Sequence, residues 1–233
     1  MSTFVFVHGA AHGAWCWSPL LRHLEAPSLA LDLPGRGKRP GDLATATGDS
    51  FASSAAADIE RAGLHDVILV GHSMAGLTLP RVADRIPERL SHLVFVSCAV
   101  PPDGKPMLDI LDPEVRSMAD AGGVGTTLSS GIPEQMAREM FCNDMDETQT
   151  RFVLDNLVPE AARILMEPAD LEGLRHPIPR TYVRLARDQS LSIDVQNRCI
   201  ESLGEIAIVD LDTGHNVMIS NPKALAEILN GLL

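Results

Sequence analysis

The residue best suited to chemistry is Ser73, in the stretch VGHSMAG at residues 70–76. It follows an apolar segment and precedes a helical pattern, and a sharp turn from strand to helix can hold a serine in a strained conformation that exposes its Oγ. Such a turn needs small neighbours. Gly71, Ala75 and Gly76 supply them, with Ala75 in the place of the second glycine of the G-x-S-x-G pattern. The pattern predicts a nucleophile, and the alternative is a serine that caps a helix.

A serine nucleophile needs a general base, and His215 is the best candidate. A hydroxyl is a weak nucleophile at neutral pH, and histidine is the side chain that changes charge in that range. His215 lies in LDTGHNVMI, where the last predicted strand gives way to the last helix. That strand end would open at the same edge of a parallel sheet as Ser73, where ligands bind in α/β folds. A lone loop histidine is otherwise more often a surface residue.

The third group should be an acid that orients the imidazole and stabilises its charged form. Asp188, in YVRLARDQS, follows the fifth predicted strand and so faces the same edge. Asp210 and Asp212 compete for this role, but they lie in or at the end of the last strand. They are too close along the chain to reach round to the ring of His215 easily, so surface or capping roles suit them better.

The backbone amides of Ala10 and Met74 are predicted to bind the charge that develops on a reacting carbonyl oxygen. Preorganised donors of this kind contribute about 3 to 4 kcal/mol each. One donor is the N–H that follows the nucleophile, which belongs to Met74. The other should come from VHGAAHGAW, after the first strand, where Gly9 and Ala10 leave the backbone open. The alternative for this loop is a plain tight turn.

Short apolar runs that alternate with helical patterns must position these groups. This alternation indicates parallel strands joined by crossover helices, and runs without polar alternation indicate strands covered on both faces. Pro80 should kink or shorten the third helix, because proline lacks an N–H. The predicted strands span 3–7, 28–33, 66–70, 92–97, 181–185 and 205–211, and the predicted helices span 15–25, 50–62, 74–85, 193–202 and 222–232.

The alternation breaks between residues 100 and 179. This stretch contains the glycine-rich patch AGGVGTTLSSG and six of the nine methionines, and it is too long for a loop inside a compact domain. We therefore expect a single α/β domain over residues 1–233 with a mostly helical insertion at about 100–179, lying over the sheet. The six methionines are Met107, Met118, Met136, Met140, Met145 and Met166.

The composition and net charge of the chain limit the classes of partner and substrate that we expect it to bind. With 45% hydrophobic and 21% charged residues, the 233-residue chain has the composition of a globular protein. A formal net charge of −12 argues against nucleic acid and against an anionic membrane surface, and it favours a substrate that is neutral overall. No apolar run is long enough to span a bilayer. The start MSTFVFVHGA enters a strand pattern directly, which predicts a cytoplasmic protein.

Neither a metal nor a cofactor is indicated. The four cysteines, Cys16, Cys98, Cys142 and Cys199, show no C-x-x-C spacing, so we expect buried free thiols. The eight histidines are dispersed. Two glycine-rich stretches, DLPGRGKRP and GGVGTTL, lack the spacing or the context of a phosphate-binding loop.

In this order, FVFVHGAAHGAWCW, LDLPGRG, GHSMAGL, RDQS and TGHNVMI resemble the α/β-hydrolase superfamily. More narrowly, the chain is similar to the branch of plant methyl esterases and hydroxynitrile lyases, with bacterial esterase relatives. The resemblance covers nearly the whole chain and is weakest over 100–179. It implies an α/β-hydrolase fold with six parallel strands flanked by helices, and a cap formed by the insertion, whose methionines and leucines would line an apolar pocket.

The resemblance implies a serine carboxylesterase for small, neutral, largely apolar esters, acting through an acyl-enzyme without a cofactor. The lyases of this branch use the same triad with a threonine after the first histidine and a lysine after the last. Gly9 and Asn216 stand at those places, so the positive charge that would stabilise cyanide is missing and hydrolysis is favoured. Two further possibilities are a carbon–carbon hydrolase with the same triad and a non-catalytic small-molecule receptor.

Overall fold

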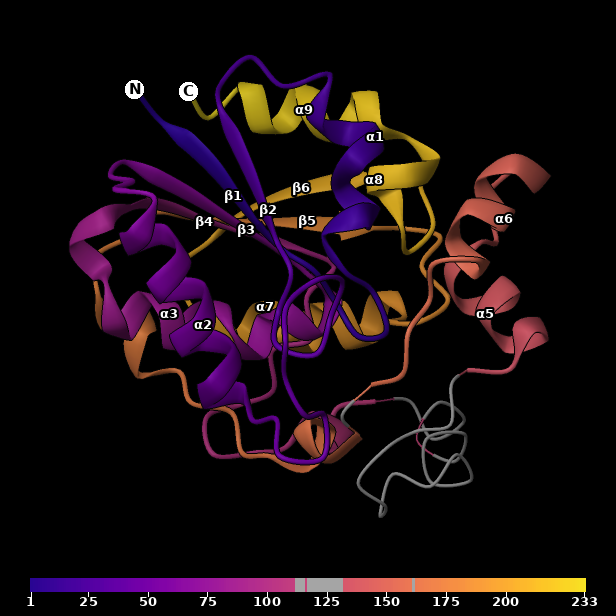
Figure 1. Ribbon diagram of the computed structural model, residues 1–233, viewed down its shortest axis with the longest axis horizontal. Helices are drawn as coiled ribbons and strands as arrows, with labels where there is room; N and C mark the ends of the chain where they lie inside the picture. Colours follow the sequence, from indigo (N-terminus) through magenta and orange to yellow (C-terminus); the bar gives the residue numbers. More distant parts are fainter. Residues whose placement is uncertain (112–115, 117–131, 161) are drawn as a thin grey trace.

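A computed structural model describes residues 1–111, 116, 132–160 and 162–233. The centre of the molecule is a parallel sheet of six strands (Figure 1). The strand order is β2-β1-β3-β4-β5-β6, and every neighbouring pair is parallel. The predicted fold class and strand number are confirmed. The strands are β1 Thr3–Val7, β2 Ser28–Leu31, β3 Val67–His72, β4 Leu90–Val96, β5 Arg180–Leu185 and β6 Ala207–Leu211.

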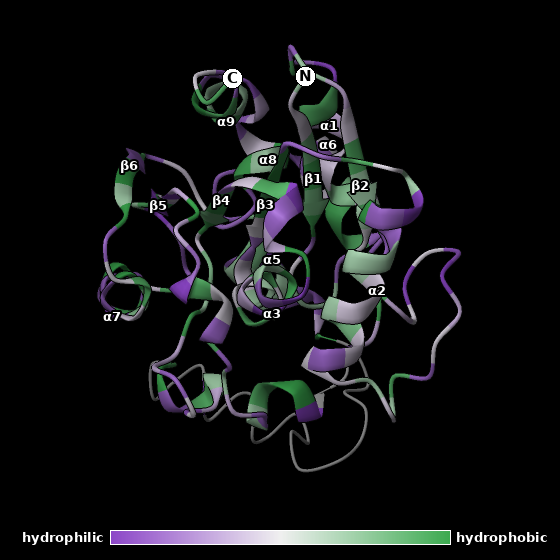
Figure 2. Cartoon of the chain, turned by 90° about the vertical axis from the view of Figure 1, so that its left-hand side faces the viewer, coloured by the Kyte–Doolittle hydropathy of each residue, from purple (hydrophilic) through white to green (hydrophobic). Residues whose placement is uncertain are grey.

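Helices cover both faces of the sheet. In Figure 1, α1 (Ser18–Leu21), α8 (Val217–Ser220) and α9 (Pro222–Asn230) lie on one face, and α2 (Gly48–Arg61), α3 (Leu79–Arg85) and α7 (Ile193–Leu203) lie on the other. Figure 2 shows the hydrophobic colour on the central strands between these layers.

The apolar strands predicted to be buried on both faces divide their side chains between two cores. Val5 and Val7 of β1 pack with the α2 and α3 layer, whereas Phe4 and Phe6 pack with the α1 and α9 layer. This division follows from the two-residue period of a strand, which sends alternate side chains to opposite faces. Both cores thus anchor β1, whose carboxyl end leads into the loop that contains Ala10.

Three strand boundaries differ from the prediction in ways that concern the site. The third strand continues past Val70 to His72, so that Ser73 follows it directly. The fourth strand ends at Val96, because Ser97 has a φ of 40°, outside the extended region. The second strand ends at Leu31, two residues before the predicted end.

Two predicted helices were wrong in extent, and in each a proline lies where a 3-10 helix gives way to an α-helix. The helix expected over 15–25 is a 3-10 turn, η1 (Ala14–Trp17), followed by the short α1, which has a proline in its first turn. The helix expected over 74–85 divides into a 3-10 helix, η2 (Ser73–Leu77), and α3, with Pro80 in the first turn of α3. Proline is tolerated in a first turn, where its missing N–H has no helical partner. The sequence analysis missed α8 altogether.

Within the described residues of the stretch from 100 to 179 lie two α-helices, α5 (Glu134–Phe141) and α6 (Glu147–Leu154), and three 3-10 helices, Met107–Asp109, Ala162–Met166 and Glu172–Arg175. In Figure 1, α5 and α6 stand apart from the two helical layers, beyond one end of the sheet. The glycine-rich patch and Met118 lie outside the described residues. In the part of the chain that is described, no helix is long and apolar enough to cross a membrane.

Candidate active site

Ser73 occupies a strained turn at the carboxyl end of β3. Its φ of 54° lies in the left-handed region, which a serine adopts only where its surroundings impose it. A Cβ added to Gly71 would come within 2.5 Å of the Leu79 side chain, and a Cβ added to Gly76 would come within 2.2 Å of the Ala99 carbonyl oxygen. Packing around the turn therefore requires the small residues that the sequence places there.

The hydroxyl of Ser73 has no structural role within the described residues. Its Oγ takes part in no hydrogen bond there, and the N-cap position of η2 belongs to His72. The alternative of a helix-capping serine is therefore not realised. Ala75, at the place of the second glycine of the motif, is accommodated in full burial.

Asp188 and His215, which are 27 residues apart, form a buried pair. His215 Nδ1 lies 2.6 Å from Asp188 Oδ2, and the two side chains are 2% and 0% exposed, in the order His215 and Asp188. The Asp188 carboxylate accepts three further hydrogen bonds, from the N–H groups of Ser190 (2.7 Å) and Leu191 (2.9 Å) and from Ser97 Oγ (2.6 Å). Four donors hold the carboxylate in one orientation, so the histidine ring that it binds is also held.

The two competing carboxylates lie elsewhere. Asp210 forms an ion pair with Arg184 at 2.6 Å, and Asp212 forms one with Arg187 at 3.1 Å. Both are surface pairs, as expected from their position in and after the last strand.

His72 holds the backbone of His215 beside the serine turn. His72 Nε2–H donates to the His215 carbonyl oxygen at 2.9 Å, and the two rings lie 4.4 Å apart between centroids. Because His72 directly precedes Ser73, this bond ties the predicted base, His215, to the predicted nucleophile, Ser73, through one residue. Among the residues that are described, no hydrogen bond joins Ser73 Oγ to the His215 ring. Such bonds are often formed only when a substrate is bound.

Residues of the expected insertion contact His215. Phe141, at the end of α5, stacks on the His215 ring with 5.7 Å between centroids and an angle of 24°. The Gly214 N–H donates to Asp144 Oδ2 at 2.7 Å. The connection from α5 to α6 therefore helps to fix the loop that carries the histidine.

In the loop after β1, the Ala10 amide lies between carbonyl oxygens that accept hydrogen bonds. His8 Nδ1–H donates to the Gly9 carbonyl oxygen at 2.8 Å, and His12 Nδ1–H donates to the Ala10 carbonyl oxygen at 2.7 Å. The Ala10 N–H bonds to no acceptor in the described part of the chain. The loop also lies against the serine, because a Cβ added to Gly9 would be 2.8 Å from Ser73 Cβ.

Met74 is the second residue of η2. The first N–H groups of a helix have no acceptor inside it, so the Met74 amide is available at the start of η2. The Ser73 carbonyl oxygen accepts from the Ala99 N–H at 2.9 Å, which fixes the peptide group that contains the Met74 N–H.

Burial keeps three histidines around the site neutral. It lowers the pKa of His8 to about 3 and that of His12 to about 4, and it holds the pKa of His72 well below its usual value. Their tautomers follow from their partners, since a carbonyl oxygen can only accept. His8 Nε2 is thus free to accept from the Leu33 N–H at 3.2 Å.

The sequence analysis missed several buried polar residues around the predicted set. Ser97 bonds to Asp188 from the end of β4. Asn216 is fully buried and donates through Nδ2 to His12 Nε2 at 3.1 Å. Glu160 bonds to the loop after β1 from 149 residues away. No motif marks Ser97 or Glu160, and the motif TGHNVMI that contains Asn216 does not indicate its contact with His12, because these roles depend on contacts between distant segments.

A cleft of about 360 Å³ lies between the loop after β1 and the α5 and α6 region. It is lined by Ala11, Ile132, Glu134, Arg151, Leu154, Asp155, Leu157, Val158 and Pro159. Within the described ranges, no three histidine, cysteine or acidic side chains are grouped so that they could hold a metal ion.

Comparison with known proteins identifies the class. Residues 4–228 match the model of the alpha/beta hydrolase family, and the chain belongs to that family. Its relatives include methylesterase 9 of Arabidopsis thaliana, with 27% identity over 98% of this chain and 97% of the relative. A carbendazim hydrolyzing esterase of a Nocardioides species is 29% identical over the full length of both proteins. The chain falls in the branch of methylesterases and bacterial esterases that its motifs resemble.

Solved structures agree on the fold. An extracellular α/β-hydrolase from a Paenibacillus species superimposes with a TM-score of 0.89 at 23% identity, covering 98% of each chain. A methylesterase from Arabidopsis, MES16, superimposes with a TM-score of 0.80 at 24% identity, covering 100% of this chain and 98% of its own.

Proposed function

We propose that this protein is a serine carboxylesterase. The observation that carries the proposal is the buried hydrogen bond between Asp188 and His215, held through His72 beside the strained turn of Ser73. The methylesterase and esterase relatives support action on an ester bond.

In the proposed reaction, Ser73 Oγ attacks the ester carbonyl carbon while His215 Nε2 takes the hydroxyl proton. Asp188 keeps the His215 proton on Nδ1 and stabilises the imidazolium that forms. The tetrahedral intermediate collapses, the bond to the alcohol oxygen breaks, and His215 returns the proton to the leaving alcohol. Water then attacks the acyl-enzyme by the same route and releases the acid, so no cofactor is used.

The amides of Ala10 and Met74 are the proposed donors to the oxyanion. The support is that the Ala10 N–H lacks an acceptor in the described structure, although the Gly9 and Ala10 carbonyl oxygens and the Ala11 N–H are bonded. The Met74 N–H follows the nucleophile at the start of η2. Both donors would be in place before charge develops, which is what makes such a site effective.

The substrates that we propose are small, neutral and largely apolar esters. Aromatic side chains gather near the site, with Trp15 stacked on His12 at 5.1 Å and Phe152 edge-on to Trp15 at 5.4 Å. An overall charge of −12 disfavours anionic substrates. We also propose a cytoplasmic location, which the four free, buried cysteines suit.

The direct test is Ser73→Ala. We expect kcat for a simple aryl ester to fall by several orders of magnitude, on the order of 10⁶ in comparable serine enzymes, with the fold retained. Ser53→Ala, which removes an exposed serine of α2, is the matched control and should retain full activity. Undiminished hydrolysis by Ser73→Ala would overturn the assignment.

The competing functions predict different results. A hydroxynitrile lyase would release cyanide from a cyanohydrin without ester turnover, but a side chain at Gly9 would collide with Ser73 and Asn216 carries no charge. A carbon–carbon hydrolase would turn over a diketone and leave the ester intact. A receptor would leave Ser73 inert to a fluorophosphonate probe, whereas an activated serine would be labelled.

A further inference from the structure

A distant carboxylate holds the strained residue next to Ala10. Ala11 has a φ of 58°, in the left-handed region that alanine rarely adopts. Its N–H donates to Glu160 Oε2 at 2.8 Å, and its carbonyl oxygen accepts from the Val158 N–H at 3.0 Å. Residues 158–160 therefore bind both backbone polar groups of Ala11, which stabilises a conformation that is otherwise unfavourable.

Arg36 fixes Glu160 in turn. Arg36 Nη2 donates to Glu160 Oε1, and the two side chains are 0% and 8% exposed. The guanidinium also lies 5.8 Å from the centroid of the Phe51 ring. A buried pair of opposite charges tolerates little movement, because separating them would leave charge unpaired in a medium of low dielectric constant. Glu160 Oε2 is thus held where the Ala11 N–H can reach it.

The turn that carries Arg36 also supports His8. The Leu33 N–H donates to His8 Nε2 at 3.2 Å, and the Leu33 carbonyl oxygen accepts from the Arg36 N–H at 3.0 Å. One turn therefore supports both peptide groups that flank Ala10. It reaches the preceding peptide group through His8 and the following one through Glu160.

We propose that Glu160 is a positioning residue for the oxyanion site, a role that rests on the proposed function. With Arg36 as its anchor, the carboxylate keeps Ala11 in the left-handed conformation, and this conformation aims the Ala10 N–H at the reacting carbonyl. Without an acceptor at residue 160, Ala11 can relax toward an ordinary conformation. The adjoining peptide groups then rotate, and the Ala10 N–H no longer points at the reacting carbonyl.

The test must separate the role of the Glu160 side chain as a hydrogen-bond acceptor from the role of its negative charge. Removing Glu160 alone would leave Arg36 buried without a partner, which is strongly destabilising. Two double variants avoid this problem, Arg36→Met/Glu160→Gln and Arg36→Met/Glu160→Met. Neither retains a charge at these two positions, and the three side chains at residue 160 are similar in length. Only the glutamine keeps an oxygen that can accept from the Ala11 N–H.

We expect kcat of the Glu160→Met double variant to be about 10 to 100 times lower than that of the Glu160→Gln double variant, with KM equal within about threefold. Inhibition by a trifluoromethyl ketone, which forms an oxyanion on reaction with the serine, should weaken by the same factor. Affinity for the carboxylic acid product should not change. A merely structural role would lower the melting temperature of one variant without this split between kcat and KM.

Equal kcat values in the two double variants, with the unmodified enzyme active and labelled at Ser73 by a fluorophosphonate, would overturn the role of Glu160 and leave the proposed function standing. An unmodified protein that neither hydrolyses esters nor is labelled would overturn both. If a double variant fails to fold, an NMR measurement on the unmodified protein tests the proposal instead. An Ala11 amide that stays protected from exchange while the Ala10 amide shifts downfield on reaction with the trifluoromethyl ketone supports the proposal, and rapid exchange at Ala11 or an unshifted Ala10 amide overturns it.

Discussion

Asp188 is the most constrained side chain of the site. Each of its oxygens accepts two hydrogen bonds, and Ser97 shares Oδ2 with the imidazole of His215. Ser97 reaches this position because its φ of 40° turns the chain at the end of β4. A residue outside the proposed triad therefore helps to set the orientation of the His215 ring, through the carboxylate that both side chains bind.

Ser97→Ala tests this coupling. It removes one donor from a buried carboxylate, so we expect a loss of about 2 kcal/mol in the free energy of unfolding and a fall in kcat of about tenfold. Urea unfolding and aryl ester kinetics measure the two effects. Ser202→Ala, which removes a hydroxyl bonded to the backbone of its own helix, serves as the control. An unchanged kcat would show that three donors suffice to hold Asp188.

Gly9→Ala tests the close approach of the loop after β1 to Ser73, the proposed nucleophile. The added methyl would lie 2.8 Å from Ser73 Cβ and 3.1 Å from the His72 carbonyl oxygen, so one of them must move. We expect kcat/KM to fall at least about 100-fold, with a loss of stability of about 1 to 3 kcal/mol.

Gly63→Ala is the matched control for Gly9→Ala. A Cβ there meets no atom within 4 Å, although the φ of +64° makes the substitution strained. Its activity should equal that of the parent protein. A fully active Gly9→Ala variant would mean that the loop can retreat without disturbing the serine.

Among the elements, the junction between η2 and α3 contains a proline, and a neighbouring side chain replaces the hydrogen-bond donor that the proline lacks. Pro80 cannot donate to the Leu77 carbonyl oxygen, which a 3-10 helix would require. Arg81 supplies the missing donor, with Nη1 at 2.7 Å from that oxygen, and its Nη2 donates to the Pro168 carbonyl oxygen at 2.7 Å. The helix after Ser73 is thereby joined to the stretch that precedes β5.

Arg81→Met should leave both carbonyl oxygens without this donor. Because Arg81 is buried, we expect a loss of about 3 kcal/mol in the free energy of unfolding, measured by urea denaturation. Arg61→Met, which removes an exposed arginine of α2, should change stability by no more than about 0.5 kcal/mol. Equal unfolding midpoints for the two variants would contradict the role given to Arg81.

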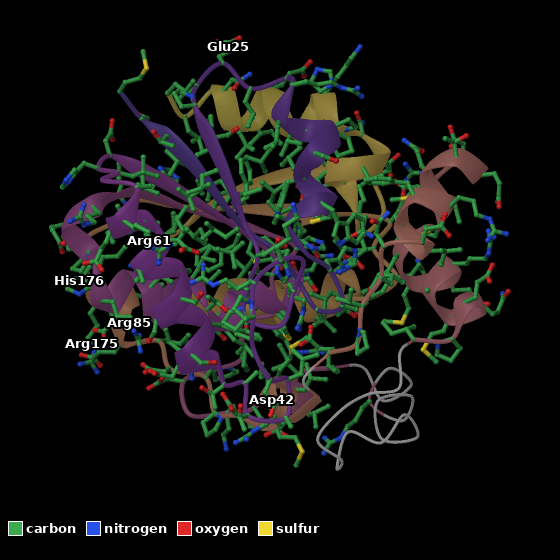
Figure 3. All side chains as sticks on the ribbon, viewed as in Figure 1. Glu25, Asp42, Arg61, Arg85, Arg175 and His176 are labelled. Atoms are coloured by element: carbon green, nitrogen blue, oxygen red, sulfur yellow. The ribbon has the colours of Figure 1, made fainter. Side chains whose placement is uncertain are left out.

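At the scale of the whole molecule, most charged side chains lie at the surface, and the few that are buried, such as Arg36, Glu160 and Asp188, have partners. Figure 3 shows the labelled side chains of Arg61, Arg85, Arg175 and His176 on the side of the molecule away from α5 and α6. The interior near the site instead holds neutral histidines. Their pKa values lie below the value of about 6.5 for an exposed histidine, because burial disfavours the charged form.

Stability should therefore fall as the solution is made mildly acidic. Below about pH 6.5 the unfolded chain binds protons at His8, His12 and His72. In the folded chain burial lowers the pKa of His8 to about 3 and that of His12 to about 4, and it holds the pKa of His72 well below its usual value. We expect a loss of about 1 kcal/mol for each of the three between about pH 7 and pH 5.5. Urea unfolding at the two pH values measures it. Exposed carboxylates stay ionised in this window, so equal stabilities would contradict the burial of neutral histidines.

Most of the fold could be predicted from the sequence, because local pattern determines it. The apolar runs of β1 and β5 and the glycine-rich turn after β3 indicate their structure through residues close together in the chain. The helix over 15–25 was wrong and α8 was missed, because propensity over a few residues competes with proline and with packing. The arrangement of residues 100–179 depends on contacts between segments, which no local pattern predicts.

The candidate site likewise contains some residues that could be predicted from the sequence and others that could not. Ser73, Asp188 and His215 could be proposed because each follows a recognisable strand end, and the structure brings Asp188 and His215 together. Ser97 and Glu160 could not, because a serine after a strand and a glutamate in a long insertion have no distinctive spacing. Their importance comes from the atoms that they meet in the folded chain.

The final strand gives the site a weak point. β6 is an edge strand that pairs only with β5 in the described sheet, and His215 follows it by four residues. Local fraying of such an edge requires less free energy than global unfolding. A molecule with β6 detached would retain five paired strands but lose the strand that leads to the proposed base, so we expect local opening of this edge to abolish activity before the rest of the sheet unfolds.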